Sequence, residues 1–138
     1  MTILDTDVLS ALMRQTPEKG VIDWLDQQPR NSIWTSSITI LEVRFGLQIL
    51  ESGKRRSALM QSFDKVLEAI SHRVATFDAT AAEVAGDLMA ARQKRGKRGD
   101  LRDTMIAGIV LANHATLATH NTAHFADLAV RVVDPLST

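Results

Sequence analysis

Short apolar runs alternate along this chain with longer segments in which apolar residues recur every three or four positions. The short runs predict β-strands, because a buried strand needs only a few consecutive apolar or β-branched residues. The five runs that we interpret as strands are residues Thr2–Leu4, Ser32–Thr35, Arg73–Phe77, Ala115–Asn121 and Val130–Val133.

The longer periodic segments predict amphipathic helices. Polar residues that can cap a helix precede several of them, and Pro17, Pro29 and Gly53 interrupt the pattern where helices should end. In chain order, the helices that we expect cover about residues 7–13, 21–25, 37–49, 59–70, 79–95 and 101–114.

Strands that alternate with helices indicate an α/β fold with a mainly parallel sheet of about five strands. Right-handed crossover connections place helices on both faces of such a sheet, which gives three layers. The chain has 138 residues and no Pro/Gly-rich linker, so we expect residues 1–138 to form one domain.

Composition narrows the class of protein only a little. Sixteen basic residues balance sixteen acidic ones, so the net charge of zero neither favours nor excludes a nucleic-acid partner. The absence of cysteine excludes a disulfide scaffold and a thiolate metal site, and it agrees with a reducing cytoplasm. No apolar run approaches the roughly 20 residues of a membrane span, and the first residues do not resemble a secretory signal.

Acidic and polar residues fall where the predicted strands end. Asp5 follows the first strand, Asn121 ends the fourth, Glu42 lies about a turn and a half into the helix after the second strand, and Asp103 lies near the start of the helix before the fourth. The carboxyl ends of parallel strands share one edge, where ligands usually bind. Three carboxylates that are far apart in sequence can therefore converge there.

Each acid also has a simpler interpretation. Asp5 or Asp7 can cap the first helix, Asp100 can cap the helix from residue 101, and Asp103 can complement that helix's dipole. Glu42 stands in the apolar segment "ITILEVRFGL", which indicates partial burial, and a buried carboxylate needs a partner. That partner is either an arginine or a metal ion.

Electrostatics favours a metal if the three acids do meet. Two carboxylates about 4 Å apart repel by roughly 4 kcal/mol at an effective dielectric constant of 20, so a cluster requires raised pKa values or a cation. Oxygen ligands suit Mg²⁺ or Mn²⁺ better than zinc. A sparse acidic site of this kind suits phosphodiester hydrolysis by a metal-activated water.

Four segments together resemble the PIN-domain ribonucleases, and among them the VapC toxins of bacterial toxin–antitoxin pairs, in particular the FitB-like subgroup. They are "ILDTDVLSALM", "SSITILEVRFGL", "DLRDTMIAGIVLANHATLATHNTAHF" and "VRVVDP". The resemblance covers essentially the whole chain, with the segments in the family's order and spacing. It implies a PIN-like fold and a Mg²⁺- or Mn²⁺-dependent endoribonuclease in which Asp5, Glu42 and Asp103 hold the metal and activate the attacking water.

The chain departs from the family pattern at three positions. Asn121 replaces a frequent fourth acid in the context Thr119-His120-Asn121, and His124 stands where an acid often precedes phenylalanine. We therefore expect one firmly held cation, leave the number of metals open, and consider Asn121, Thr119 and Asp100 auxiliary to the site. Asp7 replaces a frequent asparagine, and we interpret it as the cap of the first helix.

Zinc is the poorer hypothesis for the two histidines near the fourth strand. His120 and His124 are four positions apart, but they straddle a predicted strand end and no cysteine or glutamate completes a ligand set.

Basic residues gather next to Asp103, namely Arg92, Lys94, Arg95, Lys97, Arg98 and Arg102. They can guide an RNA backbone toward the acids, or the first of them can simply form the solvated end of a helix. We assign RNA binding to Arg95, Lys97, Arg98 and Arg102. Aromatic residues make up 4% of the chain, so recognition by base stacking is not expected.

The partners are implied by the resemblance. They are a VapB-like antitoxin, an RNA substrate such as tRNA or another structured RNA, operator DNA reached only through the antitoxin, and a second copy of the chain in a homodimer. The helices on either side of Gly53 carry apolar residues that could border a groove for the antitoxin's amphipathic helix. The resemblance implies no membrane and a cytoplasmic location.

Two other functions are alternatives to a ribonuclease. One is a PIN-like module with weakened catalysis that acts mainly as a partner in an antitoxin–DNA complex, which the missing acid at Asn121 suggests. The other is a phosphatase or receiver domain, which we rank last because no lysine follows the fourth strand in "THN".

Overall fold

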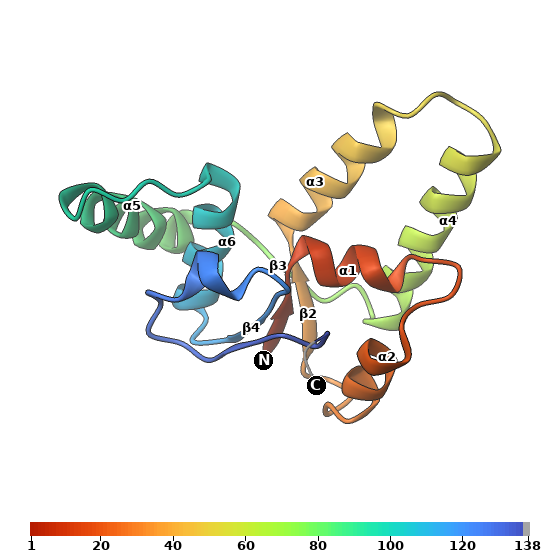
Figure 1. The fold of residues 1–138 in the computed structure, drawn as a ribbon, viewed down its shortest axis with the longest axis horizontal. Coiled ribbons are helices and arrows are strands. Elements are labelled where there is room, and N and C mark those ends of the chain that lie inside the picture. Colours follow the sequence, from red (N-terminus) through yellow and green to blue (C-terminus); the bar gives the residue numbers. More distant parts are fainter. Residues whose placement is uncertain (137–138) are drawn as a thin grey trace.

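The structure is a computed structural model that describes residues 1–136. It contains a five-stranded parallel sheet with helices on both sides, as the sequence predicts (Figure 1). The strands are β1 (Thr2–Leu4), β2 (Ile33–Ser36), β3 (Val74–Ala75), β4 (Thr116–Ala118) and β5 (Val132–Val133). The helices are α1 (Thr6–Leu12), α2 (Lys19–Asp26), α3 (Ser37–Gln48), α4 (Lys54–Ala69), α5 (Ala79–Lys94) and α6 (Leu101–Ala112), with a short 3₁₀ helix η1 (Thr122–Phe125).

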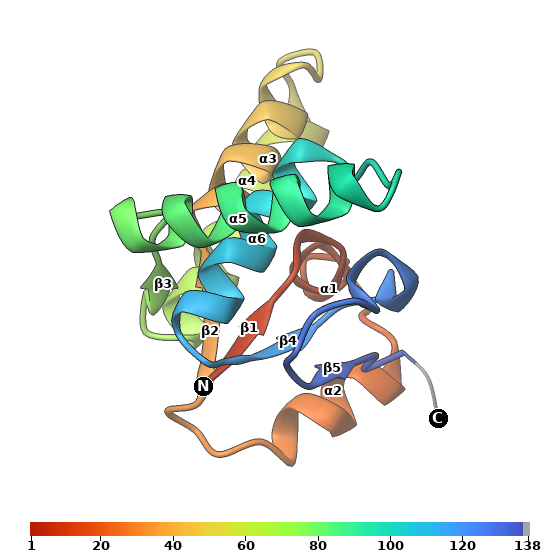
Figure 2. The same cartoon turned by 90° about the vertical axis from the view of Figure 1, so that its left-hand side faces the viewer.

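The strand order places the chain's reversal point beside β1. The order is β3-β2-β1-β4-β5, so the chain moves outward from β1 to β3 and then crosses to the other side of β1 to form β4 (Figure 2). Ligands of open parallel sheets bind outside the carboxyl ends of the strands at such a switch point. Here that point lies between the ends of β1 and β4.

Alternate residues of the central strands enter two different cores. Ile3 and Leu117 pack into a cluster with α5 and α6, whereas Leu4 and Ala118 pack into a cluster with α1, α2 and α4. This alternation follows from the pleat, which points successive side chains to opposite faces. Helices cover both faces of the sheet, so the fold has three layers.

Helices α3 and α4 form a hairpin that extends beyond the sheet (Figure 1). A third apolar cluster, which includes Val43, Leu47 and Phe63, joins them to α1. The periodic residues Leu41, Phe45 and Ile49 of α3 and its C-cap do not contribute to this core, since each is more than half exposed.

Within the part of the chain that the structure describes, no helix is both long enough and apolar enough to cross a membrane.

Candidate functional site

Asp5 lies at the end of β1 and is almost completely buried, with 4% of its surface exposed. Its amide donates to the carbonyl of Ala118 in β4 at 2.9 Å, so the residue is fixed between the two central strands. Its carboxylate accepts one hydrogen bond from the Thr6 amide and one from the Thr119 hydroxyl, both at 2.8 Å. Asp5 is therefore both the N-cap of α1 and a buried acid at the switch point.

The environment of Asp5 disfavours its charged form. Burial raises the pKa of its carboxyl from an ordinary 3.8 to about 6, although the hydrogen bonds from Thr119 and Thr6 oppose this shift. The negative charges of Asp7 and Asp103 contribute to this raised value. Burial and like charge together are the conditions that a bound cation would relieve.

Glu42 on α3 is joined to Asp5 through Thr6. The Thr6 hydroxyl donates to the Glu42 Oε1 atom at 2.8 Å while the Thr6 amide donates to Asp5. Arg102 lies 3.8 Å from the Glu42 Oε2 atom, but both side chains are partly exposed, so this ion pair is weak. Glu42 thus has an arginine neighbour as well as a connection to the acid at β1.

Asp103 lies in the first turn of α6, which Asp100 caps by accepting from the Asp103 amide at 3.1 Å. The Asp103 Oδ2 atom is 3.1 Å from the His124 Nδ1 atom of η1. The prediction that Asp100 caps this helix is confirmed. The pairing of Asp103 with His124 was not predicted, because nothing in the sequence says which side chains η1 presents to α6.

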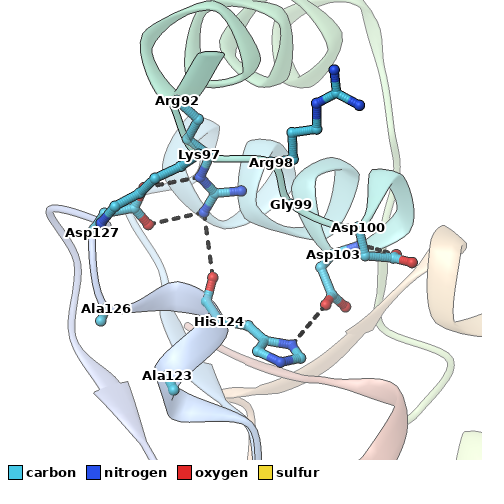
Figure 3. Close-up of a pocket in the computed structure, with 10 residues that line it drawn as sticks. All are labelled: Arg92, Lys97, Arg98, Gly99, Asp100, Asp103, Ala123, His124, Ala126 and Asp127. Atoms are coloured by element: carbon cyan, nitrogen blue, oxygen red, sulfur yellow. Dashed lines mark hydrogen bonds and ion pairs between the residues drawn. The ribbon is translucent and has the colours of Figure 1, made fainter. Parts of the chain in front are cut away.

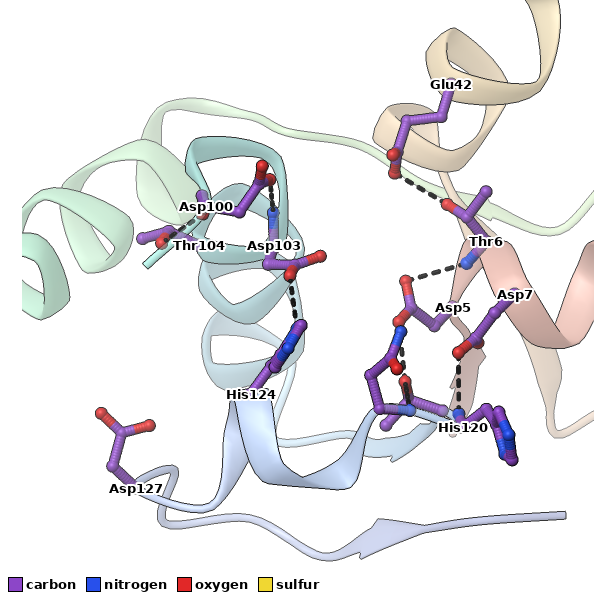
Figure 4. Close-up of polar contacts among 12 residues, drawn as sticks. Asp5, Thr6, Asp7, Glu42, Asp100, Asp103, Thr104, His120, His124 and Asp127 are labelled. Carbon is purple, nitrogen blue, oxygen red and sulfur yellow. Dashed lines mark hydrogen bonds and ion pairs between the residues drawn. The ribbon is translucent and has the colours of Figure 1, made fainter. Parts of the chain in front are cut away.

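Figure 4 shows that the side chains of Asp5, Glu42 and Asp103, which come from the end of β1, from α3 and from α6, lie on the same side of the sheet edge. Asp103 is near enough to Asp5 for its negative charge to raise the pKa of the Asp5 carboxyl. As the side chains of residues 1–136 lie, however, no three histidine or acidic residues are close enough together to enclose a metal ion. The three acids lie at the same edge of the sheet, but their carboxylates do not surround a common point.

Asp7 does not cap α1, and our interpretation of it was wrong. Asp5 is the N-cap, and Asp7 lies inside the first turn. The Asp7 Oδ2 atom accepts from the His120 amide at 3.0 Å. Its Oδ1 atom is buried without a hydrogen-bond partner among the described residues, and burial raises the pKa of this carboxyl.

Of the three residues expected to be auxiliary, Asp100 caps α6, whereas Thr119 and Asn121 follow β4, which ends at Ala118 and not at Asn121 as predicted. Thr119 is fully buried; it donates to Asp5 and accepts from the Asn121 amide at 3.0 Å. Asn121 is exposed. The two histidines face different carboxylates, since His120 contacts Asp134 at 3.2 Å and His124 contacts Asp103, and they do not form a zinc site with each other.

The basic segment divides into a structural part and an accessible part. Arg92 is buried and pairs with Asp127, so it is not free to bind RNA. Arg95 lies 3.5 Å from the same carboxylate. Lys97 and Arg98 border a pocket of about 380 Å³ that also includes Asp103 and His124 (Figure 3). This pocket opens the acidic edge to a ligand from the side of α5 and α6.

Sequence reasoning missed two residues of the site. Thr6 connects Asp5 to Glu42, and its signal was a hydroxyl residue directly after the first acid. Asp127 holds Arg92, and the sequence carries no signal for a pair that is 35 positions apart.

Comparison with known proteins identifies close relatives over the full length. The family model for the PIN domain matches residues 2–131. The chain is 35% identical to plasmid stability protein StbB of Pseudomonas syringae pv. tomato, with 98% of both chains covered, and 35% identical to VapC ribonuclease Y4jK of Sinorhizobium fredii, with 98% and 97% covered. The structure of FitAB bound to an IR36 DNA fragment matches with a TM-score of 0.88 and 29% identity, covering 100% of this chain and 97% of that one.

Proposed function

Because this chain belongs to the PIN-domain family, we propose that it is a Mg²⁺- or Mn²⁺-dependent endoribonuclease that acts as the toxin of a VapBC-type toxin–antitoxin pair. The observation that carries this proposal is the position of Asp5. It is a buried carboxylate at the switch point of a parallel sheet, and Glu42 and Asp103 border the same region. All three acids come from segments far apart in the sequence.

The side chains at this edge suit a hard divalent cation. Their donors are carboxylate oxygens, and Asp5 is buried beside other negative charges with no cationic side chain among its hydrogen-bond partners. Magnesium commonly takes only one or two protein carboxylates and keeps several waters, so the acids need not close around one point. We assign Asp5, Glu42 and Asp103 as the residues that would hold the metal.

When bound, the metal would lower the pKa of a water molecule and offset the negative charge that builds up on the scissile phosphate. The protein's part is to orient the acids. Thr119 and Thr6 fix the two oxygen atoms of Asp5, and Thr6 also fixes Glu42. His124 restricts the carboxylate of Asp103.

RNA would reach the acids along the accessible basic residues. Lys97 and Arg98 border the pocket beside Asp103. Arg95, the C-cap of α5, lies 3.5 Å from the pocket residue Asp127, and Arg102 of α6 lies 3.8 Å from Glu42. Such contacts are made to the phosphate backbone and weaken with added salt. We expect the RNA to be recognised by its shape and backbone, as tRNA or another structured RNA would be.

An antitoxin would bind beside the hairpin of α3 and α4, on either side of Gly53. Helices α1, α3 and α4 border a groove of about 280 Å³, and its apolar lining includes Met13, Val43, Leu47, Leu50 and Leu59. This groove suits the apolar face of an amphipathic helix. The FitAB relative is bound to DNA, which supports our proposal that this chain reaches operator DNA through its antitoxin.

A second copy of the chain would cover the exposed stripe of α3. Leu41, Phe45 and Ile49 lie four positions apart and are 53%, 58% and 68% exposed, so they form one apolar face. Phe45→Glu should convert a homodimer to a monomer in sedimentation, while Glu83→Gln on the exposed face of α5 should not.

The alternative is a module with weakened catalysis. Asn121 at the position of a frequent acid, together with carboxylates that do not enclose a point, favours this reading. Purified protein with Mn²⁺ and a structured RNA separates the two functions. We expect cleavage that Asp5→Asn abolishes; cleavage by neither protein would favour the weakened module, and equal cleavage by both would exclude Asp5 from the reaction.

A further inference from the structure

Arg92, at the end of α5, is a buried cation with four directed contacts. Only 6% of its surface is exposed. Its guanidinium donates to both carboxylate oxygens of Asp127 at 2.9 Å and to the His124 carbonyl at 3.4 Å (Figure 3). It also donates to the Thr104 hydroxyl at 3.1 Å. The planar fork of arginine allows this set, whereas a lysine ammonium would act as a single point charge.

The contacts of Arg92 lie on both sides of Asp103. Thr104 is the next residue of α6, and its hydroxyl also donates to the Asp100 carbonyl at 2.9 Å. His124 on η1 has its carbonyl held by Arg92 while its ring contacts the Asp103 Oδ2 atom at 3.1 Å. Arg92 therefore joins the two elements that border the Asp103 carboxylate.

Gly99 shows how closely the neighbouring loop fits this group. A Cβ atom at Gly99 would lie 2.9 Å from the Arg92 Nη1 atom and 3.4 Å from the Thr104 Oγ1 atom. The loop between α5 and α6 also returns a hydrogen bond from the Lys97 amide to the Arg92 carbonyl at 2.8 Å. A side chain at position 99 would therefore press on the guanidinium and displace it.

Stability alone is a weak reason for such a pair, because well-packed apolar side chains of similar volume often stabilise a protein as much as a buried ion pair does. The ion pair also orients the groups around it, because the hydrogen bonds of the guanidinium have defined angles and distances. We propose that the Arg92–Asp127 ion pair positions the Asp103 carboxylate, acting through Thr104 on one side and through His124 on the other. This inference rests on the proposed function, in which Asp103 belongs to the nuclease site.

The first test follows the His124 ring and needs no catalysis. A hydrogen bond to a carboxylate fixes which ring nitrogen carries the proton. In metal-free protein, ¹⁵N NMR of the imidazoles should show His124 held as the Nδ1–H tautomer, and Asp127→Asn or Arg92→Lys should shift its signals toward those of a free imidazole. Lys94→Gln, an exposed change on the same helix, is the control and should leave them in place.

Unchanged His124 signals in folded Asp127→Asn and Arg92→Lys proteins would overturn the proposal. If Asp127→Asn does not fold, Gly99→Ala carries the test, since it displaces the guanidinium without removing a charge. The same shift of the His124 signals is expected for it, and an unchanged spectrum again contradicts the positioning role.

The second test measures cleavage at a temperature where circular dichroism shows every variant fully folded. Asp127→Asn and Gly99→Ala should lower kcat by roughly 10- to 100-fold, as loss of a residue that orients a ligand usually does, with KM for RNA close to that of the unmodified chain. Adding His124→Ala to Asp127→Asn should cost less than the sum of the two single effects, because both act on Asp103. Full activity in the folded variants, or additive effects, would contradict the proposal. If the unmodified chain cleaves no RNA, the proposed function fails while the NMR result still decides the positioning.

Discussion

Thr119 donates a 2.8 Å hydrogen bond from its hydroxyl to the Oδ2 atom of Asp5, although the two residues are 114 positions apart. The contact joins the ends of β1 and β4, and both side chains are buried there. It fixes the direction of the carboxylate but does not supply the positive charge that a buried anion lacks. The energetic cost of this arrangement can be measured.

Asp5→Asn should stabilise the metal-free protein at neutral pH. Because burial raises the pKa of Asp5 to about 6, the unfolded chain ionises this carboxyl near pH 4 while the folded chain resists ionisation until about pH 6. The carboxyl therefore lowers the free energy of unfolding as pH rises through this window, by about 2–3 kcal/mol in full. Asparagine removes this penalty and can still accept from the Thr6 amide.

Urea unfolding in a chelating buffer checks this prediction. The variant should exceed the unmodified chain in stability at pH 7.5, and the difference should shrink toward pH 4, where Asp5 is protonated in the folded state. A variant that is less stable at pH 7.5 would show that the charged carboxylate is well solvated.

Thr6→Val should reduce cleavage because it removes the hydroxyl that fixes Glu42 while keeping the shape of the side chain. We expect a fall in kcat of roughly 10- to 100-fold, the usual effect of removing a group that orients a metal ligand. Thr6→Ser retains the hydroxyl and should remain active. Equal activity of the valine and serine variants in single-turnover assays would refute a role for this hydrogen bond.

Asp127→Ala should destabilise the fold by about 3 kcal/mol, because it leaves the buried Arg92 without a counter-charge. The double variant Arg92→Met/Asp127→Leu should regain most of this loss.

The hydrogen bond from Arg92 holds the pKa of Asp127 below its usual value, so the stabilisation is present above about pH 4 and is lost as pH falls through that lowered pKa. Denaturation of the single variant at pH 7 and pH 3 should thus show a smaller deficit in acid.

Gly108→Ala should lower the free energy of unfolding by about 1–3 kcal/mol. A Cβ atom at Gly108 would lie 2.6 Å from the Ala81 carbonyl oxygen and 2.8 Å from the Ala85 Cβ atom, so α5 and α6 would have to separate. Gly86→Ala, with open space around it in α5, is the matched control and should raise stability by about 0.5–1 kcal/mol through helix propensity. Calorimetric melting of both variants decides; a stabilising effect at Gly108 would mean that the two helices are not in close contact.

Hydrophobic periodicity was sufficient to predict the five strands, the parallel sheet and the edge at which Asp5 and Asp103 lie. It did not show what covers an apolar face, and for this reason the exposure of Phe45 was not foreseen. The burial of Arg92 could not be predicted either, because it stands in a run of basic residues. Its partner Asp127 is 35 positions away and contacts it only in the folded chain. Asp5 and Asp7 both satisfy the local rule for a helix cap, and only the strand end at Leu4 decides between them.

Direct titration of the metal-free protein with Mn²⁺, followed by calorimetry without RNA, tests the central claim that Asp5, Glu42 and Asp103 serve one cation. If the three acids share a cation, we expect measurable binding to the unmodified chain, loss of binding in Asp5→Asn and Asp103→Asn, and weaker binding in Glu42→Gln. Equal binding by all four proteins, or none by the unmodified chain, would contradict it.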